Sequence, residues 1–337
     1  MPDDPMPDHP MPDHPVRWGF LGAGWVASRA MAPAVHTAHG AVLHAVASRD
    51  ADRSRTLEPN RVHGEYADLL DDPEVEVVDI SLRNGQHREW VERALTAGKH
   101  VLCEKPLGVT ASEVRSMFAT AEQHGRLLVE AVWAQWHPRF ARLLALARSG
   151  SLGELVQIDT RFTFTSDTLD GNYRLDPTMG GGALLDVGCY QVHTWASLIP
   201  SVSTAPKDVS LVGVSSEVGP TGVDLTTSVR AVLGSGIRAS MHCSFVEAGS
   251  QSLRVEGTRL SVRTGDGEAF TTWREPSSLW VGGTEEHFAP VDAFTVMTEA
   301  VSARVRGDDA WIVPADQSLA VAELVDAIRN AGSRTAD

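Results

Sequence analysis

The chain has 337 residues and a formal net charge of −15, and 42% of its residues are hydrophobic. This length is long for one hydrophobic core, so two domains are expected. The negative charge disfavours nucleic acid and anionic membranes as partners, because like charges repel. No apolar run approaches the ~20 residues that span a bilayer. The composition therefore predicts a globular, cytoplasmic protein.

The three cysteines, Cys103, Cys189 and Cys243, lie far apart in the sequence. They lack the paired spacing of a zinc site, so we expect three reduced, buried thiols and no metal.

Residues 1–15 repeat Met, Pro and Asp, which predicts an extended, disordered tail. The tail lacks the basic start and apolar centre of a signal peptide.

From residue 16 the sequence alternates between short apolar runs and amphipathic segments. Strands are expected at residues 16–21, 41–47, 75–81, 100–103 and 127–130. Helices are expected between them, at residues 25–36, 66–70, 86–97 and 111–124. This alternation predicts an α/β domain with a doubly wound parallel sheet. Ligands of such a sheet bind beyond the carboxyl ends of its strands.

Near residue 150 the pattern changes to an alternation rich in Thr, Val and Ser. Residues 155–164 and most of 209–273 predict a mainly antiparallel sheet with one open, more polar face. Helices are expected at 182–198, 290–305 and 314–330. The predicted organisation is a Rossmann domain at 16–135, an α+β domain at 136–313, and a segment at 314–337 that packs back on the first domain. A cleft is expected between the two domains.

Gly22, Gly24 and Ala27 form a Gly-x-Gly-x-x-Ala turn directly after the first predicted strand. A position between a strand and a helix is what a dinucleotide-binding fingerprint requires. Gly22 allows the tight turn, Gly24 lets backbone approach a pyrophosphate, and Ala27 lets helix and strand pack closely. The helix N-terminus faces the phosphate charge. Gly-rich turns also follow strands for geometric reasons alone. The cofactor-binding interpretation of this motif therefore depends on the strand–helix repeat around it.

The second predicted strand ends in Ser48, Arg49 and Asp50. NAD enzymes usually place an acidic residue here, on the ribose 2′-hydroxyl, whereas a nearby Arg suits the 2′-phosphate of NADP. Ser48 takes the place of the acid and Arg49 follows it, so NADP(H) is favoured over NAD(H). In the alternative interpretation, Arg49 is a surface cation and Asp50 supplies the acid.

Lys105 ends the fourth predicted strand, within Glu104-Lys105-Pro106. Proline favours extended geometry at the residue before it and lowers the cost of a cis bond. Either geometry directs the ammonium into the cleft, where it bonds a substrate hydroxyl and favours its ionised form. The alternative is a solvated loop lysine.

Residues 179–193 begin with three glycines and contain Asp186, Tyr190 and His193. These three are four and three residues apart, so a helix places them on one face. A phenol is a workable proton donor when a neighbouring cation depresses its pKa. The alternative is a buried tyrosine hydrogen-bonded to an aspartate.

Together these motifs resemble the glucose–fructose oxidoreductase/inositol dehydrogenase/rhizopine-catabolism (Gfo/Idh/MocA) family of NAD(P)-dependent oxidoreductases. The resemblance rests on the glycine turn, Asn84 with His87, Glu104-Lys105-Pro106, and Gly-Gly-Gly-Ala-Leu-Leu-Asp-Val-Gly-Cys-Tyr. It extends from residue 16 to about residue 330. Many members carry histidine at the position of Tyr190. The tyrosine version is similar to dihydrodiol dehydrogenases, xylose dehydrogenases and deoxysugar 3-ketoreductases.

The resemblance implies hydride transfer between NADP(H) and a hydroxyl or ketone carbon of a sugar, nucleotide-linked keto-sugar or cyclic polyol. Lys105 is then the lysine beside the nicotinamide, which also lowers the pKa of the acid/base Tyr190, and Asp186 positions the substrate. Cofactor contacts are expected from Gly22, Gly24, Trp25, Val26, Ser48, Arg49, Leu82, Asn84, His87, Glu104 and Lys105. Substrate contacts are expected from Arg174, Asp186, His193 and Trp133.

Arg83 departs from the family pattern, which usually has proline just before the asparagine. We expect its cation to meet a cofactor phosphate or an anionic part of the substrate.

Two other functions stay open: a redox-neutral glycosidase or lyase with a tightly held nicotinamide, and a ligand-sensing regulator on the same fold. Lys105 with Tyr190 weighs against the regulator. The open sheet face predicts a homo-oligomer, a dimer or tetramer.

Overall fold

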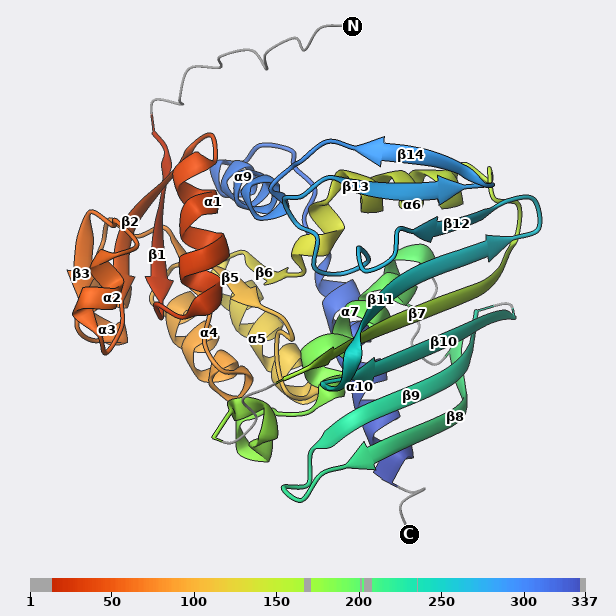
Figure 1. The fold of residues 1–337 in the computed structure, drawn as a ribbon. Coiled ribbons are helices and arrows are strands. Elements are labelled where there is room, and N and C mark those ends of the chain that lie inside the picture. The colour runs from red at the N-terminus through yellow and green to blue at the C-terminus, as the bar shows by residue number, and fades with distance from the viewer. Residues whose placement is uncertain (1–13, 167–170, 201, 203–207, 235, 334–337) are drawn as a thin grey trace, which may run out of the picture.

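The computed structural model describes residues 14–166, 171–200, 202, 208–234 and 236–333. Thirteen of the fifteen residues of the predicted tail therefore lie outside the described residues. Two sheets dominate the structure, one in each half of the chain, with helices between and around them (Figure 1).

The first sheet has six parallel strands in the order β3-β2-β1-β4-β5-β6. Its strands are β1 (Val16–Leu21), β2 (Ala41–Ala47), β3 (Arg61–His63), β4 (Val77–Ile80), β5 (His100–Glu104) and β6 (Leu128–Ala131). Nearly every residue of β1, β2, β4, β5 and β6 is buried, as expected for a sheet covered on both faces. The strand order reverses between β1 and β4, which is where such folds bind ligands. The predicted doubly wound sheet is confirmed.

The helices of this half are α1 (Ala32–Thr37), α2 (Ala51–Arg55), α3 (Tyr66–Asp71), α4 (His87–Thr96) and α5 (Ala111–His124). A π-helical turn, η1 (Ala27–Met31), leads into α1. The sequence analysis did not predict α2 and β3, because residues 51–63 are polar and too short for a periodic pattern. Asp50 starts α2 by accepting hydrogen bonds from the backbone of Asp52 and Arg53.

Two further helical segments connect the halves: the 3₁₀ turn η3 (Trp133–Trp136) and helix α6 (Pro138–Arg148). Helix α6 was also not predicted, although Pro138 at its first turn and the His137 cap are ordinary start signals. The chain then enters the second sheet.

The second sheet has eight strands in the order β14-β13-β12-β11-β7-β10-β9-β8. They are β7 (Leu155–Thr165), β8 (Val209–Val218), β9 (Asp224–Leu233), β10 (Ile237–Ser244), β11 (Val246–Gly257), β12 (Ser261–Thr264), β13 (Ser277–Val281) and β14 (Thr284–Phe288). All neighbours pair antiparallel except β7 and β10, which are parallel. The predicted mainly antiparallel sheet is confirmed.

One face of this sheet is covered by α7 (Cys189–Leu198), whose residues are all buried (Figure 1). The π-helical turn η6 (Leu184–Gly188) precedes α7 and packs on β10 and β9. On the other face, side chains such as Arg230 and Arg238 are exposed.

The last two helices are α9 (Ala293–Arg306) and α10 (Ala315–Ser333). Helix α9 packs on α1, β1 and β2 of the first half, where Trp18 Nε1 donates a hydrogen bond to Ser302 Oγ over 3.1 Å. Helix α10 contacts α5 and β6 as well as α7 and β8 of the second half. Within the described ranges, none of the helices has both the length and the hydrophobicity needed to cross a bilayer.

Candidate active site

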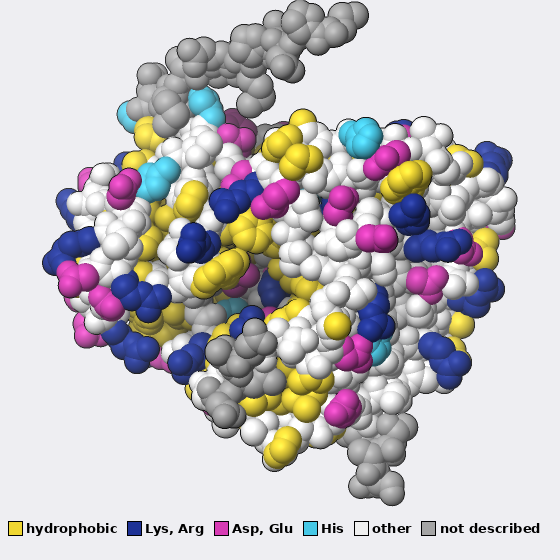
Figure 2. Space-filling model, in the orientation of Figure 1, with side chains coloured by type: hydrophobic (Ala, Val, Ile, Leu, Met, Phe, Trp, Pro, Cys, Tyr) yellow, Lys and Arg dark blue, Asp and Glu magenta, His cyan; other side chains and the backbone are white. Residues whose placement is uncertain are grey.

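A cavity of about 1070 Å³ opens at the carboxyl ends of β1, β2, β4 and β5 and reaches residues of the second half of the chain. Figure 2 shows the molecule hollowed near its centre, between the two halves. The cavity has two ends. The arginine end is lined by Ser48, Arg49, Asp50, Arg53 and Tyr66, and the lysine end by Glu104, Lys105, Phe164, Tyr173, Arg174 and Asp186.

The glycine turn also lines the cavity. Gly22 has a φ of +101°, which favours glycine, and its N–H donates to Ala47 O over 2.8 Å. A Cβ on Gly22 would lie 3.1 Å from Leu82 Cδ2 and 3.3 Å from Ser81 O. Gly22, Gly24, Trp25 and Val26 all line the cavity. The turn thus presents open backbone, and a helix start, to whatever fills the cavity.

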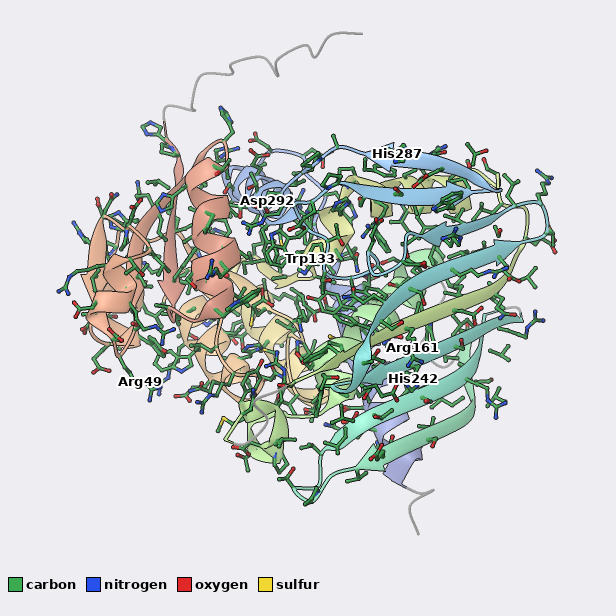
Figure 3. All side chains as sticks on the ribbon, in the orientation of Figure 1. Arg49, Trp133, Arg161, His242, His287 and Asp292 are labelled. Carbon is green, nitrogen blue, oxygen red and sulfur yellow. The ribbon has the colours of Figure 1, made fainter. Side chains whose placement is uncertain are left out.

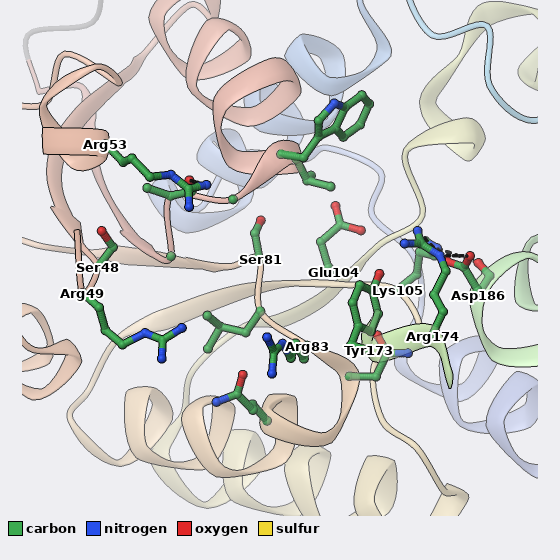
Figure 4. Close-up of a pocket in the computed structure, with 18 of the residues that line it drawn as sticks. Ser48, Arg49, Arg53, Ser81, Arg83, Glu104, Lys105, Tyr173, Arg174 and Asp186 are labelled. Carbon is green, nitrogen blue, oxygen red and sulfur yellow. Dashed lines mark hydrogen bonds and ion pairs between the residues drawn. The ribbon is translucent and has the colours of Figure 1, made fainter. Parts of the chain in front are cut away.

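At the arginine end, two guanidinium groups face the cavity (Figure 4). Arg49 is exposed and has no hydrogen-bond or ion-pair partner among the described residues, whereas Arg53 donates to Ala23 O over 2.7 Å. The Asp50 carboxylate accepts from the backbone of Asp52 and Arg53. The Ser48 hydroxyl bonds Ser54 Oγ at 2.7 Å. The acid of the alternative interpretation is therefore used to start α2.

The loop after β4 lines the cavity with Ser81, Leu82, Arg83 and Asn84. Asn84 Nδ2 donates to Gly180 O over 2.8 Å and so ties this loop to the second half of the chain. Arg83 is exposed and forms no ion pair among the described residues. Its cation stands at the cavity, as expected from the sequence, and its contact with a cofactor phosphate or an anionic substrate stays a prediction.

At the lysine end, Lys105 Nζ donates to Asp186 O over 2.6 Å and lies 3.5 Å from Asp186 Oδ1. Arg174 Nε donates to Asp186 Oδ2 over 2.6 Å (Figure 4). Burial opposes charge on Lys105, but Tyr190 and Asp186 beside it hold its pKa above the ordinary value. Burial also opposes charge on Asp186, but Lys105 and Arg174 hold its pKa below the ordinary value. The site therefore keeps one carboxylate between two cations.

Tyr190 lies behind Lys105, whose Nζ is 4.8 Å from the centroid of the phenol ring. Trp133 Nε1 donates a hydrogen bond to the Tyr190 hydroxyl over 3.0 Å. Tyr190 is 9% exposed and is not among the residues that line the large cavity. Burial raises the pKa of Tyr190, and the charge of Lys105 offsets only part of this rise. Lys105 therefore lowers the pKa of Tyr190 as expected, but burial outweighs this effect and the net shift is upward.

Three other predicted site residues are buried behind the cavity wall. His87 lies between two cavity loops, with Nδ1 3.0 Å from Pro106 O and Nε2 3.2 Å from Leu82 O, so it joins these loops from behind. His193 lies 3.2 Å from Glu130, because it points from α7 toward β6 rather than along the face of Asp186. Trp133 lies between the two sheets (Figure 3). The structure does not bring these three side chains into the cavity.

Two buried carboxyl groups underlie the lysine end. Asp79, on β4, accepts a hydrogen bond from Ser81 Oγ over 2.7 Å, and burial raises the pKa of Asp79 to about 8. Burial likewise raises the pKa of Glu104 to about 7, although Lys105 opposes the rise. Both carboxyl groups therefore stay largely protonated at higher pH values than ordinary carboxyl groups do.

Several cavity residues were not predicted as site residues, among them Arg53, Tyr66, Ser81 and Phe164. Arg53 follows Arg49 by four residues, and recognising α2 would have placed it beside Arg49. The others carry no sequence signal, since only the tertiary fold places them at the cavity. No cluster of three or more His, Cys, Asp or Glu suited to a metal occurs in the described part of the chain.

Family models match both halves of the chain. Residues 16–131 match an oxidoreductase family with an NAD-binding Rossmann fold, and residues 140–263 match the GFO/IDH/MocA C-terminal domain. The chain belongs to the GFO/IDH/MocA oxidoreductase family. As a member of this family, it is an NAD(P)-dependent oxidoreductase that acts on CH–OH groups.

Named relatives cover most of the chain. It is 33% identical over 282 residues to mouse trans-1,2-dihydrobenzene-1,2-diol dehydrogenase, covering 82% of this chain and 80% of that protein. It is 30% identical over 318 residues to D-xylose 1-dehydrogenase (NADP(+)) 2 of Haloferax volcanii, covering 92% and 95%. Among solved structures, a 3-ketoreductase from Actinomadura kijaniata, in complex with NADP and TDP-benzene, has a TM-score of 0.84 and 27% identity, covering 94% and 98%.

Proposed function

We propose that this oxidoreductase moves a hydride between NADP(H) and a hydroxyl or ketone carbon of a sugar, nucleotide-linked keto-sugar or related cyclic polyol. The observation that carries the proposal is one continuous cavity with a glycine turn and free guanidinium at one end, and a Lys105–Asp186 pair at the other. The arginine end is suited to bind a dinucleotide cofactor. The lysine end is suited to bind the substrate oxygen that takes part in the reaction.

The cavity residues fit the cofactor. The site of a Cβ on Gly22 is crowded by Leu82 and Ser81, so only glycine keeps this wall open. Gly22, Gly24, Trp25 and Val26 would line the pyrophosphate, with Leu82, Asn84 and Glu104 along the rest of the molecule. When bound, the nicotinamide supplies or accepts the hydride. His87 would act from behind, by holding the Leu82 and Pro106 loops together.

We infer a preference for NADP(H) over NAD(H). Arg49 is a cation without a partner among the described residues, at the carboxyl end of β2, and Arg53 lies beside it in the cavity. A 2′-phosphate supplies the negative charge that these groups lack, and bidentate contacts to phosphate are strong. The Ser48 hydroxyl and Arg49 are the expected contacts of this phosphate. The relative from Haloferax volcanii, whose name includes NADP(+), agrees with this choice.

In the proposed chemistry, Tyr190 gives its proton to the substrate oxygen during reduction and takes it back during oxidation. Its hydroxyl oxygen accepts the Trp133 indole N–H, which leaves the phenol proton free to be donated. Lys105 keeps its positive charge and stabilises the developing alkoxide. Asp186, held by Lys105 and Arg174, orients the substrate hydroxyls. Proton transfer of this kind contributes roughly 10²–10⁴ in rate.

The proposal is tested with NADP⁺ and a panel of D-glucose, D-xylose and myo-inositol, followed by the absorbance of reduced nicotinamide. Lys105→Ala and Tyr190→Phe should each reduce kcat by roughly 10²-fold or more, while NADPH binding, measured by fluorescence, stays close to that of the unmodified protein. Near-normal turnover in either variant would reject this acid/base pair. Product formed without net change in nicotinamide would instead indicate the redox-neutral reaction.

We also infer that two copies pair through the open face of the second sheet. This face carries a row of bonded polar side chains rather than a covering helix: Ser228 Oγ is 2.7 Å from His242 Nδ1, and Glu247 bonds both His242 and Arg161. Figure 3 shows Arg161 and His242 side by side on adjoining strands. Light scattering of the protein at micromolar concentration should give at least a dimer, and a monomer would contradict the inference.

A further inference from the structure

Two phenols flank Lys105, and only one of them lines the cavity. Tyr190 lies under Lys105 with its hydroxyl on Trp133 and is not among the residues that line the large cavity. Tyr173 lines that cavity. In Figure 4 its ring stands between Arg83 and Arg174, and its hydroxyl points toward the side where Glu104 and Lys105 lie. The phenol that a bound substrate meets first is therefore Tyr173.

The position of Tyr173 is tied to the catalytic carboxylate. Tyr173 begins the 3₁₀ turn η4 (Tyr173–Leu175), which Asn172 caps by accepting from Arg174 N. The Arg174 guanidinium lies on the ring of Tyr173, with 4.9 Å between its Cζ and the ring centroid, and it also bonds Asp186. Gly182 N donates to Arg174 O over 2.9 Å, which fixes the backbone of this turn against η6. Arg174 thus holds the phenol and the carboxylate in one arrangement.

The Tyr173 hydroxyl has a free proton to offer. No hydrogen bond to this hydroxyl occurs among the described residues, and the oxygen is not among the fully buried polar atoms. Burial raises the pKa of Tyr173, and Asp186 raises it further, while Arg174 and Lys105 oppose the rise. The group therefore remains a neutral donor across the physiological range.

We propose that Tyr173 is a substrate-binding residue of the active site, which donates a hydrogen bond to a substrate hydroxyl or carbonyl oxygen next to Lys105. This inference rests on the proposed function and assigns a different role to each of the two phenols. Tyr190 passes the proton in the chemical step, whereas Tyr173 selects substrates that carry an oxygen at one defined ring position. A site built to hydrogen-bond a substrate hydroxyl rejects the analogue without it, because its polar group is left unpaired.

Phenylalanine variants of Tyr173 and Tyr190 test the assignment. Tyr173→Phe should raise the KM of the accepted sugar roughly tenfold, the loss of one hydrogen bond, and change kcat by less than about threefold. Tyr190→Phe should lower kcat instead.

Deoxy sugars provide a measurement that a merely structural role would not change. The unmodified protein should discriminate roughly tenfold between the sugar and one of its deoxy analogues, and Tyr173→Phe should lose that discrimination at the same ring position. Equal discrimination by both proteins at every position would overturn the inference. So would a Tyr173→Phe variant that loses kcat to the extent expected of Tyr190→Phe.

Direct binding separates this inference from the proposed function. Titration calorimetry of the NADP⁺ complex with the same sugars reports substrate affinity without turnover. If the sugars bind but no nicotinamide is reduced, the proposed function fails while the Tyr173→Phe comparison still holds. If Tyr173→Phe binds every sugar as the unmodified protein does, Tyr173 is not a substrate contact.

Discussion

Arg174 Nε donates a hydrogen bond to Asp186 Oδ2 over 2.6 Å, although Arg174 lies on the turn η4 and Asp186 on η6. Lys105 contacts the same carboxylate from the end of β5. Asp186 is therefore the shared counter-ion of two cations that come from different halves of the chain. Replacing it removes the one negative charge that both require.

Asp186→Asn should reduce kcat/KM by roughly 10²-fold or more, because two partly buried cations lose their counter-ion and repel one another. The Lys105 pKa should fall, since Asp186 is one of the groups that raise it. The pH profile of kcat/KM checks this and should show the activity lost at a lower alkaline pH. An unshifted profile with full activity would contradict the counter-ion role. Circular dichroism verifies that the variant is folded.

Arg49→Ala should weaken NADPH binding at least about tenfold, or 1.4 kcal/mol, and leave NADH binding within about twofold. The reason is that only the 2′-phosphate needs the Arg49 charge. Fluorescence titration with both nucleotides measures the two affinities. Arg55→Ala is the matched control, because Arg55 is an exposed arginine of the same region that pairs with Asp52 and does not line the cavity. Equal loss for both nucleotides would mean that Arg49 contacts a shared part of the cofactor.

Asp79→Asn should remove a pH dependence of stability. The Asp79 carboxyl keeps its proton up to about pH 8 in the folded protein, whereas its ordinary pKa is 3.8. The protonated carboxyl therefore contributes to stability at low pH, and this contribution is lost as the pH rises from about 4 to about 8. The amide stays neutral and still accepts from Ser81. Thermal unfolding should therefore show Asp79→Asn more stable than the unmodified protein at pH 8 by about 2 °C or more, and the difference should shrink as the pH falls toward 4.

Asp72→Asn is the opposite control. Burial raises the pKa of Asp72, but hydrogen bonds from Glu74 N and Arg61 outweigh it and bring the pKa to about 2. The contribution of Asp72 to stability is therefore present above about pH 4 and is lost as pH falls toward 2. Asp72→Asn should destabilise the protein at pH 7, and the difference should shrink in acid. Parallel curves for the two variants would refute both assignments.

His87→Ala should loosen the two loops that His87 joins, with a loss of roughly 1–3 kcal/mol in the free energy of unfolding. NADPH affinity should fall as well, because Leu82 and Lys105 line the cavity from these loops. His36→Ala is the control: His36 also bonds a backbone carbonyl, Leu57 O at 2.8 Å, but away from the cavity. A loss of stability without loss of NADPH affinity would leave His87 a purely structural residue.

Much of the fold was predictable from local pattern. The apolar runs that became β1, β2, β4, β5 and β6 are buried on both faces, and this requires side chains that are apolar at nearly every position. The glycine turn was recognisable because a positive φ at Gly22 and a close approach by Leu82 exclude other residues. Helix α2 and strand β3 were missed, since neither is long enough to show a period.

By itself, the sequence determined the two-part architecture, the family and the set of residues at the strand ends. These follow from short-range requirements: burial, turn geometry and a fixed order of motifs. The tertiary structure alone decided which polar groups face the cavity. Helical spacing placed Asp186, Tyr190 and His193 on one face, but packing against Trp133 and Glu130 turned the latter two inward. Tyr173 reached the cavity because Arg174 holds it there, a contact across space that no local pattern records.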